Sequence, residues 1–352
     1  MKKKILLITA VISLVAILLS FAGCNDSFGM SDIRALIEDN LGWHKMTQTE
    51  VAVYDAFDKE GNKFGEYTLT VTRIYKKDVT VKAINEDNDR TLKVFDGYKF
   101  TSSLTVDDNP DYVQIAESYT SLSLTPKLSY TRKVDGTATE IFTSYGEKKA
   151  EATFIIDGKT VTSDDKYATS ILCDNTYLYQ FARVTDMSSS LSVNIPSYTM
   201  TSDLTQVYNQ AITMSFASSS NVNLDKSFIL DKTFSETVTP SGDVTPSGDV
   251  TPEVSGDLVN NGTAPSGDAP ETSTDESGNV TTTYPLTETN SIPVKSCTFA
   301  ASKDLNIQAK VMCYISTSPI KNTLEDNAFF KRVIVMIREG DMTYELTSVR
   351  YE

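Results

Sequence analysis

The segment Tyr67-Thr68-Leu69-Thr70-Val71 alternates apolar residues with threonines. This period of two places the apolar side chains on one face of an extended chain, and β-branched residues favour that conformation. The alternation is also present at Val51 and Val53 before the segment and at Val79 and Val81 after it. The pattern predicts half-buried β-strands that present one face to a core.

Turn sequences separate the predicted strands. Asp96-Gly97, Asp135-Gly136 and Asp157-Gly158 each follow an apolar strand end, and Asp-Gly is a strong hairpin signal. Lys59-Glu60-Gly61-Asn62 and Glu86-Asp87-Asn88-Asp89 have the composition of loops. We therefore expect an antiparallel meander, with further strands near 191–195, 212–216 and 228–230.

Helices are expected at three places. Met30 to Leu41 have an apolar stripe followed by Gly42, which is typical of a helix and its stop signal. Asn109-Pro110-Asp111 has a cap residue followed by proline, and predicts a helix with Val113, Ala116 and Tyr119 on one face. The stretch 169–184 favours a helix over a strand by a small margin. The fold class is thus α+β, mainly antiparallel β, with a curved sheet or half-barrel, an N-terminal helix and one or two interrupting helices.

An acidic tract interrupts the ordered pattern at 234–290. The hexapeptide Thr239–Val244 is repeated at Thr245–Val250, and no Lys or Arg lies between Lys232 and Lys295. A tract of Pro, Gly, Ser, Thr and acidic residues buries too little apolar surface to offset its chain entropy. We expect a disordered acidic insertion; a calcium-binding or adhesive repeat is the alternative.

The last 62 residues, 291–352, regain strand patterns. Residues 329–337 and 342–351 predict a final hairpin around Glu339-Gly340-Asp341. Since two hairpins make a poor independent domain, these strands are expected to complete the β-rich body at 31–233. A separate small domain is the alternative.

The N-terminal residues have the pattern of an export signal. Met1-Lys2-Lys3-Lys4 is cationic, and residues 5–22 are mostly apolar. Ser20-Phe21-Ala22-Gly23-Cys24 resembles the lipobox of bacterial lipoproteins, although Phe21 stands where leucine is commonest. An uncleaved membrane helix is the alternative on length alone.

The lipobox resemblance implies that residues 1–23 are a signal peptide and that Cys24 is the lipidation site. Diacylglycerol and palmitate on Cys24 would anchor the chain to the cell membrane at its extracytoplasmic face, with 24–30 as a short spacer. Removing 1–23 takes away three lysines and no acid, which lowers the formal net charge from −15 to −18. A chain this acidic is repelled by nucleic acid.

Three further cysteines, Cys173, Cys297 and Cys313, cannot all pair within the chain. Buried thiols are expected. A disulfide between Cys297 and Cys313, which flank a predicted hairpin turn near Leu305, is the alternative.

The residues offer no strong catalytic or metal motif. His44 is the only histidine, which excludes multi-histidine metal sites. Ser163-Asp164-Asp165-Lys166 has the Ser-x-x-Lys spacing of penicillin-binding proteins but lacks a proper Lys-Thr-Gly partner. Asp107, Asn109 and Asp111 imitate a calcium loop without its glycine and glutamate. We expect no enzyme activity, no catalytic residue, no metal and no cofactor.

A lipid-anchored chain with one N-terminal helix, a long meander of Asp-Gly hairpins and an interrupting helix resembles the Lol-type half-barrel carriers, which handle acyl chains. The resemblance implies a cavity for an apolar or amphipathic, lipid-like ligand, although no binding residue can be carried over. One alternative is a cell-surface interaction or adhesion module without a cavity, which presents a sheet face to a surface protein or a glycan. A second alternative is an unrecognised hydrolase.

Overall fold

The computed structural model describes residues 37, 41–167, 171–185, 187, 190–200, 205–231, 271–274, 280–283, 286–301, 311–323 and 329–352. The predicted signal peptide, Cys24, the spacer, most of the predicted N-terminal helix, most of the acidic tract and the turn near Leu305 lie outside these residues. Among the described residues, no helix has the length and apolar character needed to cross a membrane.

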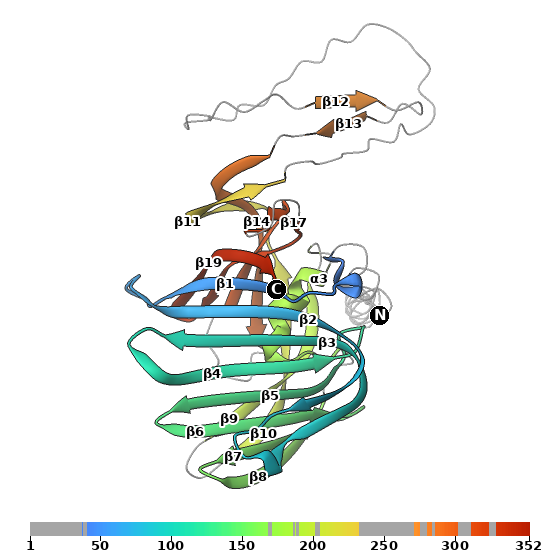
Figure 1. Ribbon diagram of the computed structural model, residues 1–352, viewed down its shortest axis with the longest axis vertical. Helices are drawn as coiled ribbons and strands as arrows, with labels where there is room; N and C mark the ends of the chain where they lie inside the picture. Colours follow the sequence, from blue (N-terminus) through green and yellow to red (C-terminus); the bar gives the residue numbers. More distant parts are fainter. Residues whose placement is uncertain are drawn as a thin grey trace, which may run out of the picture.

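The first half of the chain forms an antiparallel meander in which each strand pairs with the next (Figure 1). Its strands are β1 (Glu50–Phe57), β2 (Lys63–Val81), β3 (Arg90–Val106), β4 (Asn109–Thr120), β5 (Pro126–Asp135), β6 (Thr137–Tyr145), β7 (Lys149–Ile156) and β8 (Lys159–Lys166). Short 3₁₀ turns lie before β1 (η2, Trp43–Lys45) and between β2 and β3 (η3, Glu86–Asn88).

The second half adds further strands, of which the first two run behind the meander in Figure 1 and several others lie above it. They are β9 (Leu191–Met200), β10 (Thr205–Phe216), β11 (Ser220–Leu230), β14 (Thr287–Ala301), β15 (Val311–Ser316), β16 (Ile320–Lys321), β17 (Phe329–Phe330), β18 (Ile334–Glu339) and β19 (Met342–Tyr351). β10 pairs with β9 and β14, β14 with β11 and β15, and β15 with β18. β18 pairs with β19, and β19 pairs with β1 along its whole length, so the two halves share one sheet.

The fold class expected from the sequence is confirmed: the chain is mainly antiparallel β with an open, curved sheet. One short α-helix, α3 (Leu178–Val184), follows the 3₁₀ turn η4 (Asn175–Tyr177) among the described residues. It lies within the stretch for which a helix was favoured. Within the acidic tract, β12 (Glu271–Thr274) pairs with β13 (Val280–Thr283), and β14 already begins at Thr287.

The helix predicted after Asn109-Pro110-Asp111 is wrong, because these residues begin strand β4. Val106 of β3 pairs with Asn109, so the connection is a tight turn at residues 107–108. β4 is paired with β3 on one edge and β5 on the other, and this pairing overrides the local helix signal. Consequently Ala116 and Tyr119, expected on one helix face, point to opposite faces of the sheet.

The hairpin turns at Asp135-Gly136 and Asp157-Gly158 are confirmed, since β5–β6 and β7–β8 meet there. The turn predicted at Asp96-Gly97 is wrong, because both residues lie inside β3. A Cβ atom on Gly97 would stand 1.9 Å from the carbonyl oxygen of Thr120. Glycine is therefore needed there for a close backbone approach.

The meander has two faces, which we call inner and outer. The inner face looks toward α3 and contributes to the main core, which includes Phe100, Tyr177 and Phe181. Tyr177 stacks on Phe100 with ring centroids 5.0 Å apart. The three described cysteines are buried and free, as expected, although Cys297 and Cys313 are directly opposed on β14 and β15.

The outer face carries a second, smaller core that is covered by the far end of the β2–β3 hairpin, residues 75–95, here called the arm. The register of β2 and β3 shifts after Ile74, where Lys76 takes a φ of 35°. The arm bends there and runs across the neighbouring strands (Figure 1). It is held by the backbone N–H of Ile84, which donates to the buried carboxylate of Glu140 over 2.8 Å. The residues of this outer core are Ile74, Val81, Phe95, Tyr119, Leu128, Tyr130, Phe142 and Ile155.

A buried ion pair fixes α3 to the first strand. The guanidinium of Arg183 donates to Glu50 on β1 over 2.5 Å and to the carbonyl oxygen of Lys331 over 3.0 Å. The indole N–H of Trp43 donates to the second carboxylate oxygen of Glu50 over 3.0 Å. Arg183 and Glu50 are both buried, so each charge depends on the other.

Candidate ligand-binding cavity

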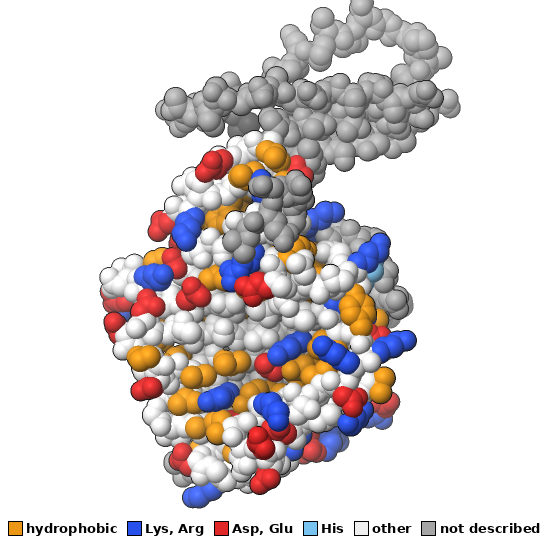
Figure 2. Space-filling view, in the orientation of Figure 1, with side chains coloured by type: hydrophobic (Ala, Val, Ile, Leu, Met, Phe, Trp, Pro, Cys, Tyr) orange, Lys and Arg blue, Asp and Glu red, His pale blue; other side chains and the backbone are white. Residues whose placement is uncertain are grey.

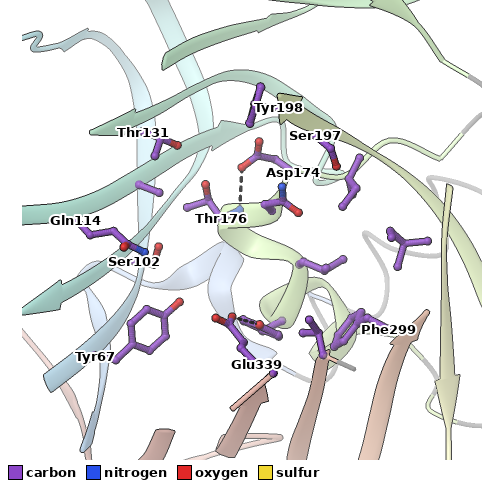
Figure 3. Close-up of a pocket in the computed structure, with 18 of the residues that line it drawn as sticks. Tyr67, Ser102, Gln114, Thr131, Asp174, Thr176, Ser197, Tyr198, Phe299 and Glu339 are labelled. Atoms are coloured by element: carbon purple, nitrogen blue, oxygen red, sulfur yellow. Dashed lines mark hydrogen bonds between the residues drawn. The ribbon is translucent and has the colours of Figure 1, made fainter. Parts of the chain in front are cut away.

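A cavity of about 620 Å³ lies between the inner face of the meander and the strands behind it (Figure 3). Its sheet wall includes Ser102 of β3, Ala116 of β4 and Thr131 of β5. These three residues are lateral neighbours in the strand register. Because their side chains are small, this row leaves space that larger residues would fill.

The opposite wall is formed by strands from the second half of the chain. Ile195 and Ser197 of β9 and Gln210 and Ile212 of β10 face the cavity. Further apolar lining comes from Leu178, Phe299, Val311 and Met342. The cavity thus joins residues separated by more than 200 positions in the sequence.

Gln210 is the most unusual polar residue of this wall. It is 3% exposed, and its side-chain oxygen accepts a hydrogen bond from the Ser197 hydroxyl over 3.1 Å. Its amide nitrogen, Nε2, has no partner among the described residues. A buried donor left unpaired costs about 1–3 kcal/mol, so this group is suited to a ligand acceptor.

One end of the cavity is organised around Asp174, which precedes η4 (Figure 3). One carboxylate oxygen of Asp174 caps the turn by accepting from the backbone N–H of Thr176 over 2.9 Å. The other accepts from the hydroxyl of Tyr145. Burial, and then the charge of Asp174, raises the pKa of Tyr145 well above its usual value, so this phenol stays a donor. Asp174 is therefore held mainly as a structural acceptor.

The other end is organised around Glu339, at the turn between β18 and β19. The hydroxyl of Tyr179 on α3 donates to the Glu339 carboxyl group. The rings of Tyr67 and Tyr344 pack beside it with centroids 4.6 Å apart. Burial raises the pKa of Glu339 above its usual value, and the hydroxyls of Tyr179 and Tyr344 offset that shift only in part.

The described lining contains two carboxyl groups and four tyrosines, and it includes no Lys, Arg or His. A fatty-acid carboxylate or a phosphate would find no counter-charge there. The mixture of apolar side chains, hydroxyls and the unpartnered, buried amide nitrogen of Gln210 suits a molecule with an apolar body and a small polar group.

The residues considered for catalysis are not brought together at this cavity. His44 lies in η2, where its carbonyl oxygen accepts from the Tyr75 hydroxyl over 3.1 Å. Ser163 and Lys166 lie on β8, and the Ser163 hydroxyl accepts from the backbone N–H of Val207 over 3.2 Å. In the described part of the chain, no group of three or more His, Cys, Asp or Glu side chains is placed to hold a metal ion.

Asp107, Asn109 and Asp111 lie at the turn and start of a hairpin, β3–β4. Cys24, the site residue predicted from the sequence, lies outside the described residues. The cavity residues carry no sequence motif. They are found only when the register of the strands is known.

No protein-family model matches the chain. No curated protein matches it either. Among solved structures, the chain is similar to the crystal structure of a β-barrel-like protein of a domain of unknown function, DUF1849, from Brucella abortus. The two chains share 10% identity at a TM-score of 0.39, over 87% of this chain and 98% of that chain. A similarity at this distance assigns no function.

Proposed function

We propose that this chain is a non-enzymatic lipoprotein, anchored through Cys24 to the extracytoplasmic face of the cell membrane, which binds an amphipathic ligand in the inner cavity. The observation that carries the binding proposal is the cavity itself. Its volume of about 620 Å³ falls within the range of roughly 300–1,000 Å³ that is usual for small-molecule sites. The anchor proposal rests on the lipobox-like residues that end at Cys24.

The two walls explain why an amphipathic molecule fits better than a purely apolar one. Ile195, Ile212 and Phe299 offer apolar surface, whereas Gln210 offers a buried donor without a partner among the described residues. An apolar ligand would leave that donor unpaired, and a strongly polar one would gain nothing from the aliphatic wall.

The binding proposal is tested by purifying the full chain from membranes under mild conditions and recording native mass spectra. We expect a non-covalent adduct of lipid-like mass on the natural chain. Ala116→Phe should remove the adduct, because a large ring would occupy the space beside Ser102 and Thr131.

Ala138→Phe is the matched control, since Ala138 is a partly exposed alanine of the same sheet that does not line the cavity. It should keep the adduct. An adduct that survives Ala116→Phe, or a natural chain that never carries one, would count against the cavity as the site. A surface interaction module without a small ligand would then be favoured.

The anchor is tested separately by metabolic labelling with a palmitate analogue. The natural chain should take up the label, and Cys24→Ser should not, because its hydroxyl cannot accept the thioether-linked diacylglycerol. A labelled Cys24→Ser protein would contradict the assignment.

A further inference from the structure

We infer that one end of the meander faces an anionic phospholipid bilayer when the chain is anchored through Cys24. This inference rests on the proposed anchor, and it adds the surface that meets the membrane and the charge of the lipid. The surface is here called the basic end. It gathers exposed lysines from separate segments of the chain: Lys45, Lys76, Lys77, Lys127, Lys148 and Lys166.

The strand register brings these segments to the same end of the meander, which lies on the right in Figure 1. Arg73 of β2 pairs with Tyr98 of β3, and Tyr98 pairs with Thr120 of β4. The turn from β4 into β5 and the turn from β6 into β7 lie at this end as well. The lysines occupy these places: Lys76 and Lys77 after Arg73, Lys127 at the start of β5, Lys148 between β6 and β7, and Lys166 at the end of β8.

The opposite end of the same strands carries more acids than lysines. The connections β1–β2, β3–β4, β5–β6 and β7–β8 lie there. Their acids, with those directly beside them, include Asp58, Glu60, Asp107, Asp108, Asp135 and Asp157. In Figure 2, Lys and Arg side chains lie along the right-hand edge of the body, whereas Asp and Glu side chains are frequent along the left-hand edge. We call this opposite end the acidic end.

The basic end has the sign opposite to that of the whole chain, whose formal net charge is −15. An anionic bilayer therefore repels the chain as a whole but attracts this end, so its field favours the orientation in which the basic end faces the lipid. None of the six lysines forms an ion pair with a described residue. Two acids nearby are paired with other lysines, Asp78 with Lys93 and Asp164 with Lys149.

Part of the basic end is hollowed. The hollow has a volume of about 600 Å³, and three lysines, one acid and two tyrosines are among the residues that line it: Lys127, Lys148, Lys166, Glu147, Tyr145 and Tyr167. The charge of this lining is positive. Ammonium groups form short, charge-assisted hydrogen bonds with phosphate oxygens, so the hollow suits the phosphate of a lipid headgroup.

Exposed apolar side chains lie at the same end. Tyr75 is 50% exposed, and its hydroxyl donates to the carbonyl oxygens of His44 and Met46, each 3.1 Å away. Val94 is 68% exposed, and its backbone N–H donates to Asp78 over 2.8 Å. A tyrosine beside lysines is typical of the membrane–water interface, where the ring contacts the acyl boundary and the cations contact headgroups.

The predicted tether joins the body at this end. Residues 25–40 connect Cys24 to Leu41, and η2 begins at Trp43. Along the chain, η2 is therefore the described element nearest to the anchor. The hydroxyl of Tyr75 fixes the start of the arm to it. An anchor at this end keeps the lysines near the bilayer, where charges interact within a screening length of about 10 Å at 0.1 M salt.

The test inserts the lipid-anchored chain into vesicles of phosphatidylcholine, either alone or mixed with anionic phosphatidylglycerol. A fluorophore is attached at Thr47→Cys beside η2, or at Thr137→Cys at the acidic end, and energy transfer to an acceptor on the lipid headgroups is measured. Both threonines are exposed, and the three described natural cysteines are buried. Since the lipid blocks the thiol of Cys24, the fluorophore reacts with the introduced cysteine.

We expect phosphatidylglycerol to raise the ratio of transfer from Thr47→Cys to transfer from Thr137→Cys about twofold, because the tether is unchanged and only the lipid charge differs. Salt at about 1 M, which shortens the screening length to about 3 Å, should remove this gain. The triple variant Lys45→Glu, Lys76→Glu, Lys127→Glu should also remove it.

The matched control makes the same change of charge at the acidic end, through Lys59→Glu, Lys133→Glu and Lys159→Glu, and should keep the gain. All the substituted lysines are exposed, so both triple variants should fold, which circular dichroism checks.

The outcomes separate the two proposals. If phosphatidylglycerol leaves the ratio unchanged, or if the basic-end variant keeps the gain, the inference is overturned while the anchor stands. Loss of the gain in the control variant also overturns it, because net charge and not the basic end would then set the orientation. A natural chain that stays in solution with both kinds of vesicle contradicts the anchor itself, and the inference fails with it.

Discussion

The two faces of the meander are built from the same strands, but the outer face is closely packed whereas the inner face borders a cavity. On the outer face, Tyr119, Tyr130 and Phe142 are large, and the arm of the neighbouring hairpin covers them closely. On the inner face, Ser102, Ala116 and Thr131 are small, and their cover comes from distant segments. The comparison shows that a cavity forms where the side chains of the sheet are small and where the segments that cover them come from distant parts of the sequence and do not pack closely against the sheet.

The largest effect is expected on the filled outer face. Phe142→Ala should lower the free energy of unfolding by about 3–5 kcal/mol, because it removes a buried ring that packs on Tyr130 at 4.7 Å between centroids. Denaturant unfolding followed by circular dichroism measures the change. Ligand binding at a temperature where the variant stays folded should be unaltered. A loss below about 1 kcal/mol would mean that the outer core is not closely packed.

Helix α3, which packs on the inner face, can be loosened by removing the ion pair between Arg183 and Glu50 of β1. Arg183→Met should cost about 3 kcal/mol, because it leaves Glu50 buried without a counter-charge. The double variant Glu50→Gln, Arg183→Met should recover at least half of that loss, since it buries no isolated charge. Equal unfolding free energies for the single and double variants would show that the charge of Glu50 is not what matters.

Filling the cavity should change stability much less. Ala116→Phe is expected to alter the free energy of unfolding by less than about 1 kcal/mol, because burial of the new ring against the apolar wall of the cavity offsets local crowding. The same unfolding titration applies, with Ala138→Phe as control. A loss of several kcal/mol would indicate that the inner face is as tightly filled as the outer one.

The smallest effect concerns pH. Burial raises the pKa of Glu339 above its unfolded value of about 4.5, so the folded chain binds the proton more tightly. The stabilising contribution is present at low pH and is lost as pH rises through the raised pKa. The melting temperature of the natural chain, relative to that of Glu339→Gln, should therefore fall between about pH 4.5 and neutrality. A constant difference across this range would show that Glu339 is not desolvated.

Several elements could be predicted from the sequence because their causes are local. Alternation from Tyr67 to Val71 predicted part of β2, and Asp157-Gly158 marked a true hairpin. Both residues of that turn take positive φ angles, 48° and 74°, which Asp and Gly tolerate. The buried, free state of Cys173, Cys297 and Cys313 was also expected from their residue type.

The errors have non-local causes. The sequence predicts a turn at Gly97, yet glycine is required there because the carbonyl oxygen of Thr120 on the next strand leaves no space for a Cβ atom. The residues Asn109-Pro110 predict a helix start in isolation. In the fold, β3 and β5 lie on either side of this segment, and their backbone groups form hydrogen bonds with it that require an extended strand. In both places the deciding contact lies outside any short window of sequence.

By itself, the sequence determined the antiparallel β class, two of the three Asp-Gly hairpin turns and the lipobox-like pattern at Cys24, because each follows from the conformational or chemical preferences of adjacent residues. Only the tertiary structure decided that Ser102, Ala116 and Thr131 align in one row opposite Gln210. A shift of one residue in any strand would turn its side chains to the other face. The cavity therefore depends on the register of the strands and on the distant strands that form its opposite wall. Both are set by the packing of the whole chain.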